Sequence, residues 1–184
     1  MLDDSDKAAL LKLARKTLEA HFADESTPKC PSSHMALTEQ KGAFVSLHLG
    51  EELRGCIGQL YPDRELSKVV QHCVLSAARE DMRFMSVEGD ELADLSIEIS
   101  VLSPFRRVQN IEEIEVGKHG LYIAQERFQG LLLPQVATQY RWDRKKFLEQ
   151  TCLKAGLQKS AWQDPQTIIH TFEAEVFSDT QNFL

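Results

Sequence analysis

The stretch AFVSLHLGEELRGCIGQL, residues 43–60, alternates apolar with other side chains on both sides of a short break at Gly50 and Glu51. Successive side chains of a strand point to opposite faces, so a period of two indicates strands. We therefore expect strands at residues 43–49 and 52–60 that form an antiparallel hairpin. The rest of the fold is built outward from this hairpin.

The apolar pattern also predicts the pairing register of the hairpin. A one-residue slip would turn polar side chains toward the core, so a three-residue connection is expected. It gives the cross-strand pairs Leu49–Leu53, Val45–Ile57 and Ser46–Cys56. Because Gly50 is not at the usual left-handed position of such a connection, a β-bulge that shifts this register is the alternative.

The two faces of the hairpin predict different roles. One face is apolar and is expected in the core, where Gly55 indicates that a helix or strand approaches the backbone closely. The opposite face carries Ser46, His48, Arg54 and Cys56, with Gly58 expected to leave room beside them. Polar side chains next to open space predict the floor of a pocket.

Arg54 and Cys56 lie about 6.5 to 7 Å apart along one face of a strand. At that separation the guanidinium can favour a thiolate, or it can hold a carboxylate or phosphate of a ligand. The alternative is an outward-facing arginine beside a cysteine that acts as a small apolar filler. The sequence leaves both interpretations open.

Composition restricts the classes of function. The 184 residues include 28 acidic and 21 basic side chains, for a net charge of −7. This charge argues against general binding to nucleic acid or to anionic membranes. The N-terminal residues lack the pattern of a signal peptide, and no apolar run approaches the ~18 residues of a spanning helix, so we expect a cytoplasmic protein.

The cysteines are Cys30, Cys56, Cys73 and Cys152, which are widely spaced and are expected as reduced thiols. Cys30 and His34 are four residues apart but have no second ligand pair of zinc-like spacing. We therefore predict neither a metal site nor a cofactor.

Helices and strands alternate loosely along the remaining chain. Helices are expected at residues 5–22, capped by Ser5 or Asp4, at 65–81, and from Asp143 to a stop at Gly156. Strands are expected at residues 95–102, 121–124, in the apolar run before Pro134, and at 168–177. The pattern predicts an α+β fold with a largely antiparallel sheet flanked by helices, in a single two-lobed domain over residues 1–184.

Several short motifs occur together in this order: LRGCIG at 53–58, DMRF at 81–84, EISVLSP at 98–104, VGKHGL at 116–121, LLPQVA at 132–137 and CLKAGL at 152–157. Together they resemble the AMMECR domain family, named for a human chromosomal region linked to Alport syndrome, midface hypoplasia and elliptocytosis. One departure is that Met85 and Ser86 follow the DMRF motif where the family usually has a proline.

The resemblance implies a two-lobed α+β domain. It also implies candidate partners, because bacterial and archaeal members often accompany a Memo-like protein and a radical SAM protein. No reaction is established for the family as a class. The positions that match its motifs are Arg54, Gly55, Cys56, Gly58, Asp81, Arg83, Phe84, Glu98, Lys118, His119, Pro134 and Gln135.

Two functions from different classes follow. The first is a non-catalytic adaptor whose pocket receives a peptide or a small anionic ligand; its expected ligand-binding residues are Arg54, Gly55, Gly58, Arg83, Glu98 and Gln135. The second is an enzyme on a small anionic substrate in which Cys56 is the nucleophile, Arg54 binds the anionic group, and His119 or His48 exchanges protons. The adaptor ranks first because the polar residues form no recognisable triad or metal set. Exposed strand edges would also be compatible with a homodimer.

Overall fold

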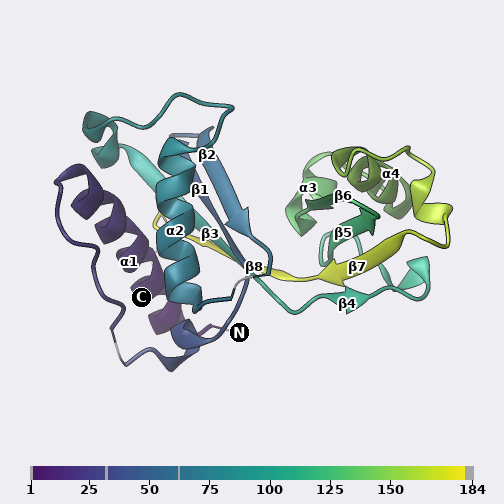
Figure 1. Ribbon diagram of the computed structural model, residues 1–184, viewed down its shortest axis with the longest axis horizontal. Helices are drawn as coiled ribbons and strands as arrows, with labels where there is room; N and C mark the ends of the chain where they lie inside the picture. Colours follow the sequence, from purple (N-terminus) through teal and green to yellow (C-terminus); the bar gives the residue numbers. More distant parts are fainter. Residues whose placement is uncertain (1, 32, 62, 181–184) are drawn as a thin grey trace. The chain divides into compact units, whose positions relative to one another are not determined.

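The computed structural model describes residues 2–31, 33–61 and 63–180 (Figure 1). The chain forms two compact units, one from the residues up to Leu102 together with those from Glu175 onward, the other from Ser103 to Ala174. Each unit contains a four-stranded sheet. The strand order of the first is β2 (Glu52–Gln59), β1 (Ala43–Leu49), β3 (Leu95–Leu102) and β8 (Ala174–Ser178), and that of the second is β4 (Arg106–Arg107), β7 (Ile168–Phe172), β5 (Gly120–Gln125) and β6 (Phe128–Leu132). The predicted α+β class is confirmed, although the strands are divided between two sheets.

The first unit packs two helices on one face of its sheet (Figure 1). Its elements are α1 (Asp4–Phe22), the 3₁₀ helix η1 (Met35–Thr38), β1 (Ala43–Leu49), β2 (Glu52–Gln59), α2 (Leu66–Arg79), η2 (Gly89–Ala93), β3 (Leu95–Leu102) and β8 (Ala174–Ser178). A β-carbon added to Gly55 would lie 2.1 Å from the carbonyl oxygen of Ala77. The predicted close approach at this glycine is therefore made by the backbone of α2.

The hairpin register is confirmed at its centre and differs at its tip. Val45 pairs with Ile57 and Ser46 pairs with Cys56, as expected, but Leu49 pairs with Glu52 instead of Leu53. The connection is shorter than predicted because Gly50 takes a left-handed conformation, with φ of +59°, in a two-residue turn.

A register shift compensates for the shorter turn. Leu47 lies opposite Gly55, whereas the next residue of β1, His48, lies opposite Leu53. The shift leaves Arg54 as the extra residue of a β-bulge, without a directly opposing residue on β1. A bulge re-aims side chains, and here it redirects the arginine of the LRGCIG motif.

The ends of two helices test the predicted caps. Asp3, not Ser5 or Asp4, caps α1, since its Oδ1 accepts the N–H of Asp6 at 2.7 Å. Asp143 caps the later helix as predicted, and Gly156 ends it in a left-handed conformation.

No helix in the described ranges has the length and hydrophobicity needed to cross a membrane.

The second unit contains β4 (Arg106–Arg107), η3 (Ile111–Glu113), β5 (Gly120–Gln125), β6 (Phe128–Leu132), α3 (Pro134–Gln139), α4 (Arg144–Lys154), η4 (Ala161–Gln163) and β7 (Ile168–Phe172). Its core includes Leu121, Ile123, Phe147 and Leu148, all fully buried. The apolar strand before Pro134 is β6, and the proline itself begins α3, where its missing N–H costs nothing.

The strand predicted at residues 168–177 is in fact two strands that belong to different sheets, β7 and β8. They are separated at Glu173, whose N–H donates to Ser103 Oγ at 2.8 Å and whose carbonyl accepts the N–H of Ser103 at 2.9 Å. Apolar alternation continues through this position, so the pattern gives no sign that the chain changes sheets.

Candidate functional site

The LRGCIG motif lies on β2, which is an edge strand of its sheet. An edge strand leaves a row of backbone N–H and C=O groups without a strand partner. At Cys56 these groups are bonded to side chains: the N–H donates to Asp81 Oδ2 at 2.9 Å, and Arg83 Nη2 donates to the carbonyl oxygen at 3.3 Å. The DMRF motif thus occupies the place of a neighbouring strand.

Asp81 and Arg83 also bond to each other. Arg83 donates from Nε to Oδ1 at 2.9 Å and from Nη2 to Oδ2 at 2.6 Å, and the aspartate side chain is only 6% exposed. The hydrogen bonds from Arg83 hold the pKa of Asp81 far below its usual value, against the opposing effect of burial, and the N–H of Cys56 lowers it further. Asp81 therefore stays ionised and keeps the motif attached to β2.

Arg54 makes the second set of contacts from the motif. Its Nε and Nη2 donate to the two carboxylate oxygens of Glu91 at 2.7 and 3.0 Å. Nη1 donates to the carbonyl of Met85 at 2.5 Å, and Nη2 also reaches that of Ser86 at 3.0 Å. The hydrogen bonds between the pair raise the pKa of Arg54 and lower that of Glu91. Every nitrogen of the guanidinium is thus bonded within the protein, and the side chain holds the loop that follows α2.

The thiol of Cys56 is half-buried and accepts a hydrogen bond from Ser46 Oγ at 3.2 Å. Ser46 in turn lies opposite Glu98 of β3. A row of three polar residues therefore crosses β2, β1 and β3: Cys56, Ser46 and Glu98. All three are singled out from the sequence.

The space expected beside Gly58 is filled. A β-carbon at Gly58 would lie 2.2 Å from the ring of Phe44, so the glycine makes room for this aromatic side chain and not for a ligand. His48 lies in a different cross-strand row, opposite Leu53 and Ser96. Its Nε2 is buried without a hydrogen-bond partner among the described residues.

The loop held by these contacts exposes large apolar side chains. Met82 is 100% exposed and Met85 is 85% exposed. Between them Phe84 is half-buried, with the guanidinium carbon of Arg83 5.3 Å from its ring centroid. We call residues 82–90 the methionine loop. The sequence singles out Arg83 and Phe84 of this loop but not its anchor Glu91, because an acidic residue in GDELAD is indistinguishable from an ordinary surface charge.

His119 and Gln135 belong to the second unit, whereas Cys56 belongs to the first. His119 Nδ1 accepts the N–H of Glu115 at 3.1 Å, so the neutral imidazole carries its proton on Nε2 and is a hydrogen-bond donor there. That tautomer cannot accept a proton at Nε2. Gln135 lies half-buried in the first turn of α3, and its carbonyl accepts a hydrogen bond from Thr138.

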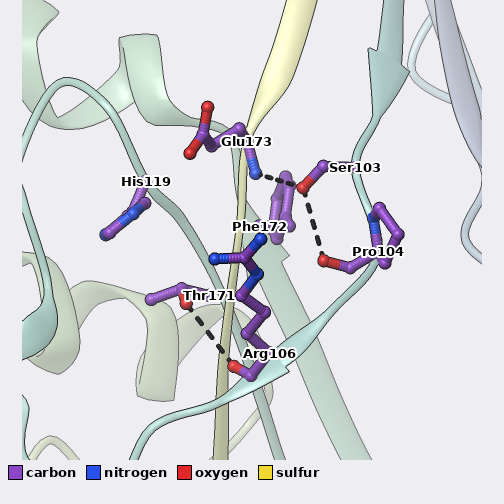
Figure 2. A pocket seen from close by; sticks show the side chains of 7 residues that line it. All are labelled: Ser103, Pro104, Arg106, His119, Thr171, Phe172 and Glu173. Atoms are coloured by element: carbon purple, nitrogen blue, oxygen red, sulfur yellow. Dashed lines mark hydrogen bonds between the residues drawn. The ribbon is translucent and has the colours of Figure 1, made fainter. Parts of the chain in front are cut away.

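The second unit also contains a cavity of about 160 Å³ beside β4 and β7 (Figure 2). It is lined by Ser103, Pro104, Arg106, His119, Thr171, Phe172 and Glu173. Of these residues only His119 was a candidate site residue from the sequence, although Ser103 and Pro104 end the EISVLSP motif. No cluster of three or more His, Cys, Asp or Glu side chains in the described part of the chain is arranged to hold a metal ion.

Comparisons with known proteins agree with the motif pattern. The model of the AMMECR1 family matches residues 11–177. A protein of Methanosarcina barkeri is 40% identical, with 98% of this chain and 94% of the relative aligned, and one of Nanoarchaeum equitans is 37% identical, with 92% and 98% aligned. The crystal structure of an uncharacterised protein from Pyrococcus horikoshii superposes with a TM-score of 0.90 at 33% identity, covering 96% of this chain and 93% of that one.

Proposed function

This chain belongs to the AMMECR1 family, and we propose that it is a cytoplasmic accessory protein that binds a partner protein through the methionine loop. The observation that carries this proposal is the use of the motif residues. The polar groups of Arg54, Asp81 and Arg83 form hydrogen bonds that hold the loop in place. The loop in turn exposes Met82 and Met85.

The loop is anchored at both ends, which favours binding. Arg83 and Asp81 attach its start to β2, and Arg54 attaches its middle and the adjoining Glu91. Between these points the N–H of Val87, a buried residue, donates to the carbonyl of Ala78 at 2.8 Å. A segment ordered before binding loses less conformational entropy when it meets a partner.

The side chains of the loop indicate the chemistry of the partner. Methionine is flexible and polarisable, and it is over-represented at surfaces that bind other proteins. The exposed charges in and beside the loop are mostly acidic: Glu80, Glu88, Asp90 and Asp94 outnumber Arg79 and Arg83, and Arg83 is paired with Asp81. We therefore expect a partner with an apolar groove rimmed by basic side chains. The resemblance to the AMMECR family makes Memo-like and radical SAM proteins the first candidates.

Titration calorimetry of this protein with a purified Memo-like protein and a purified radical SAM protein from the same organism tests the proposal. Replacing both Met82 and Met85 with alanine should weaken binding at least about tenfold, since anchor side chains each contribute on the order of 1–2 kcal/mol. Met35→Ala is the matched control, because Met35 is also 80% exposed but lies on η1. Equal affinity of the double variant and wild type would exclude the loop as the contact surface.

A cysteine-dependent enzyme is the second candidate, supported by the hydrogen bond from Ser46 Oγ to the Cys56 thiol. A donor at this distance stabilises a thiolate. Arg54 is an unsuitable anion-binding residue for such an enzyme, because Glu91 and two carbonyls already occupy its donors.

Alkylation of the native protein by iodoacetamide, followed by mass spectrometry, tests the enzyme. Cys30 is an internal reference, since both thiols are half-buried. An activated Cys56 should react about tenfold faster than Cys30, and Ser46→Ala should reduce that rate. Reaction of Cys56 only after denaturation would remove this candidate.

A further inference from the structure

The cavity in the second unit presents a positively charged group that is not used within the protein. The side chain of Arg106 extends upward from β4 into the part of the cavity bordered by Ser103 and Glu173 (Figure 2). Among the described residues, its guanidinium has neither a hydrogen bond nor an ion pair, although the carboxylate of Glu173 borders the same cavity. Arg54 and Arg83, by contrast, each pair with a carboxylate.

Apart from His119, whose Nε2–H is a donor, the remaining polar groups of the cavity are acceptors. Thr171 Oγ1 donates its proton to the carbonyl of Arg106, which leaves the oxygen free to accept. Ser103 Oγ donates to the carbonyl of Pro104, accepts the N–H of Glu173, and has one lone pair left. Glu173 adds a carboxylate, whose Oε1 is 4.0 Å from Lys118 Nζ. The cavity is thus bordered by one charged donor, Arg106, one neutral donor, His119 Nε2–H, and several acceptors.

The cavity has an apolar floor of limited size. Phe172, which is 2% exposed, lines it, and a β-carbon on Gly120 would lie 2.3 Å from the ring of this phenylalanine. The glycine therefore allows the ring to lie close against β5. A volume of about 160 Å³ fits a molecule about the size of benzene or smaller and is too small for a nucleotide.

We propose that this cavity binds a small carboxylic acid that carries a hydroxyl or ammonium group next to its carboxylate. The carboxylate pairs with the fork of Arg106, the geometry that a guanidinium recognises best. The neighbouring donor group of the ligand bonds to Glu173 and the hydroxyl oxygens, which retain lone pairs for it. Inorganic phosphate fits less well, because at neutral pH it would place added negative charge beside Glu173.

Titration of the ¹⁵N-labelled full chain with glycolate, acetate and phosphate, followed by NMR, tests the site. Glycolate should produce saturable shifts at residues 103–106, 119 and 171–173. It should bind about fivefold or more tightly than acetate, which lacks the hydroxyl, as the loss of one hydrogen bond implies. Absence of saturable shifts, or tighter binding of phosphate than of glycolate, would overturn the proposal.

Two arginine variants separate a specific contact from a general charge effect. Arg106→Gln should weaken glycolate binding about tenfold or more. Arg107→Gln removes the same charge from the next residue of β4, whose side chain points to the other face, and should change the affinity less than about twofold. Equal effects of the two substitutions, or none from the first, would contradict the assignment.

A third variant tests the ligand's donor group. Glu173→Gln should reduce the preference for glycolate over acetate, and an unchanged preference would place the hydroxyl elsewhere. The alanine substitutions at Met82 and Met85 should leave glycolate binding unaffected. Failure of this site is therefore distinguishable from failure of the proposed partner-binding loop.

Discussion

Arginine and carboxylate side chains meet in both units of this protein, but they are used differently. At the edge of β2, Arg54 pairs with Glu91 and Arg83 pairs with Asp81, and these pairs hold the methionine loop. In the second unit Arg106 and Glu173 border one cavity without pairing. Groups whose hydrogen bonds are satisfied internally build structure, whereas unsatisfied ones are available to a ligand. A motif rich in polar residues is therefore not by itself a binding site.

Among the substitutions that test this contrast, one at Gly55 should have the largest effect on the free energy of unfolding. Gly55→Ala would place a β-carbon 2.1 Å from the backbone oxygen of Ala77, so β2 and α2 must separate. We expect a loss of at least about 3 kcal/mol in the free energy of unfolding, measured by urea denaturation. Gly50→Ala is the control: the site is open but has φ of +59°, and the cost should be about 1 kcal/mol. Equal costs would show that the contact with α2 is not tight.

Arg54→Ala should give the next largest effect, because it leaves Glu91 and two loop carbonyls without their donor. The side chain is 16% exposed, so solvent screens part of the loss, and we expect about 1–2 kcal/mol. Hydrogen exchange should increase within residues 82–90 and stay unchanged in α1. Unchanged exchange in the loop would mean that Arg54 does not hold it.

Asp81 predicts a pH dependence of stability. Because its pKa is lower in the folded state than in the unfolded chain, the carboxylate stabilises the fold above about pH 4. This contribution declines as the pH falls below the unfolded value toward the folded one. Wild type should exceed Asp81→Asn in unfolding free energy at pH 7, and the difference should shrink at pH 3. A difference that is constant across this range would contradict the role of the charge.

The smallest effect on stability is expected at Arg106, which, unlike Arg54 and Arg83, has no carboxylate partner among the described residues. Arg106→Gln removes an exposed charge that has no internal partner among the described residues, so the unfolding free energy should change by less than about 0.5 kcal/mol. Thermal denaturation followed by circular dichroism measures this. A loss comparable to that of Arg54→Ala would show that both arginines are structural.

Much of the fold could be predicted because local patterns report burial. The alternation in residues 43–59 predicts the hairpin and the pairing of Ser46 with Cys56, and Asp143 and Gly156 mark the two ends of α4. The bulge was predicted only as an alternative to the three-residue connection, and its position at Arg54 was not, since it depends on the conformation that Gly50 takes in the turn. The pairing of Arg54 with Glu91 joins residues 37 positions apart, and nothing in the local sequence links them.

The side chains bonded to the backbone of Cys56 also have a consequence for self-association. They occupy hydrogen-bonding groups that a second copy of the chain would need in order to extend the sheet from β2. Since this protection depends on an ionised carboxylate, acidification should uncover the strand at the same time as it loosens the fold. Aggregation at low pH, and its acceleration by Asp81→Asn, would then begin at this edge.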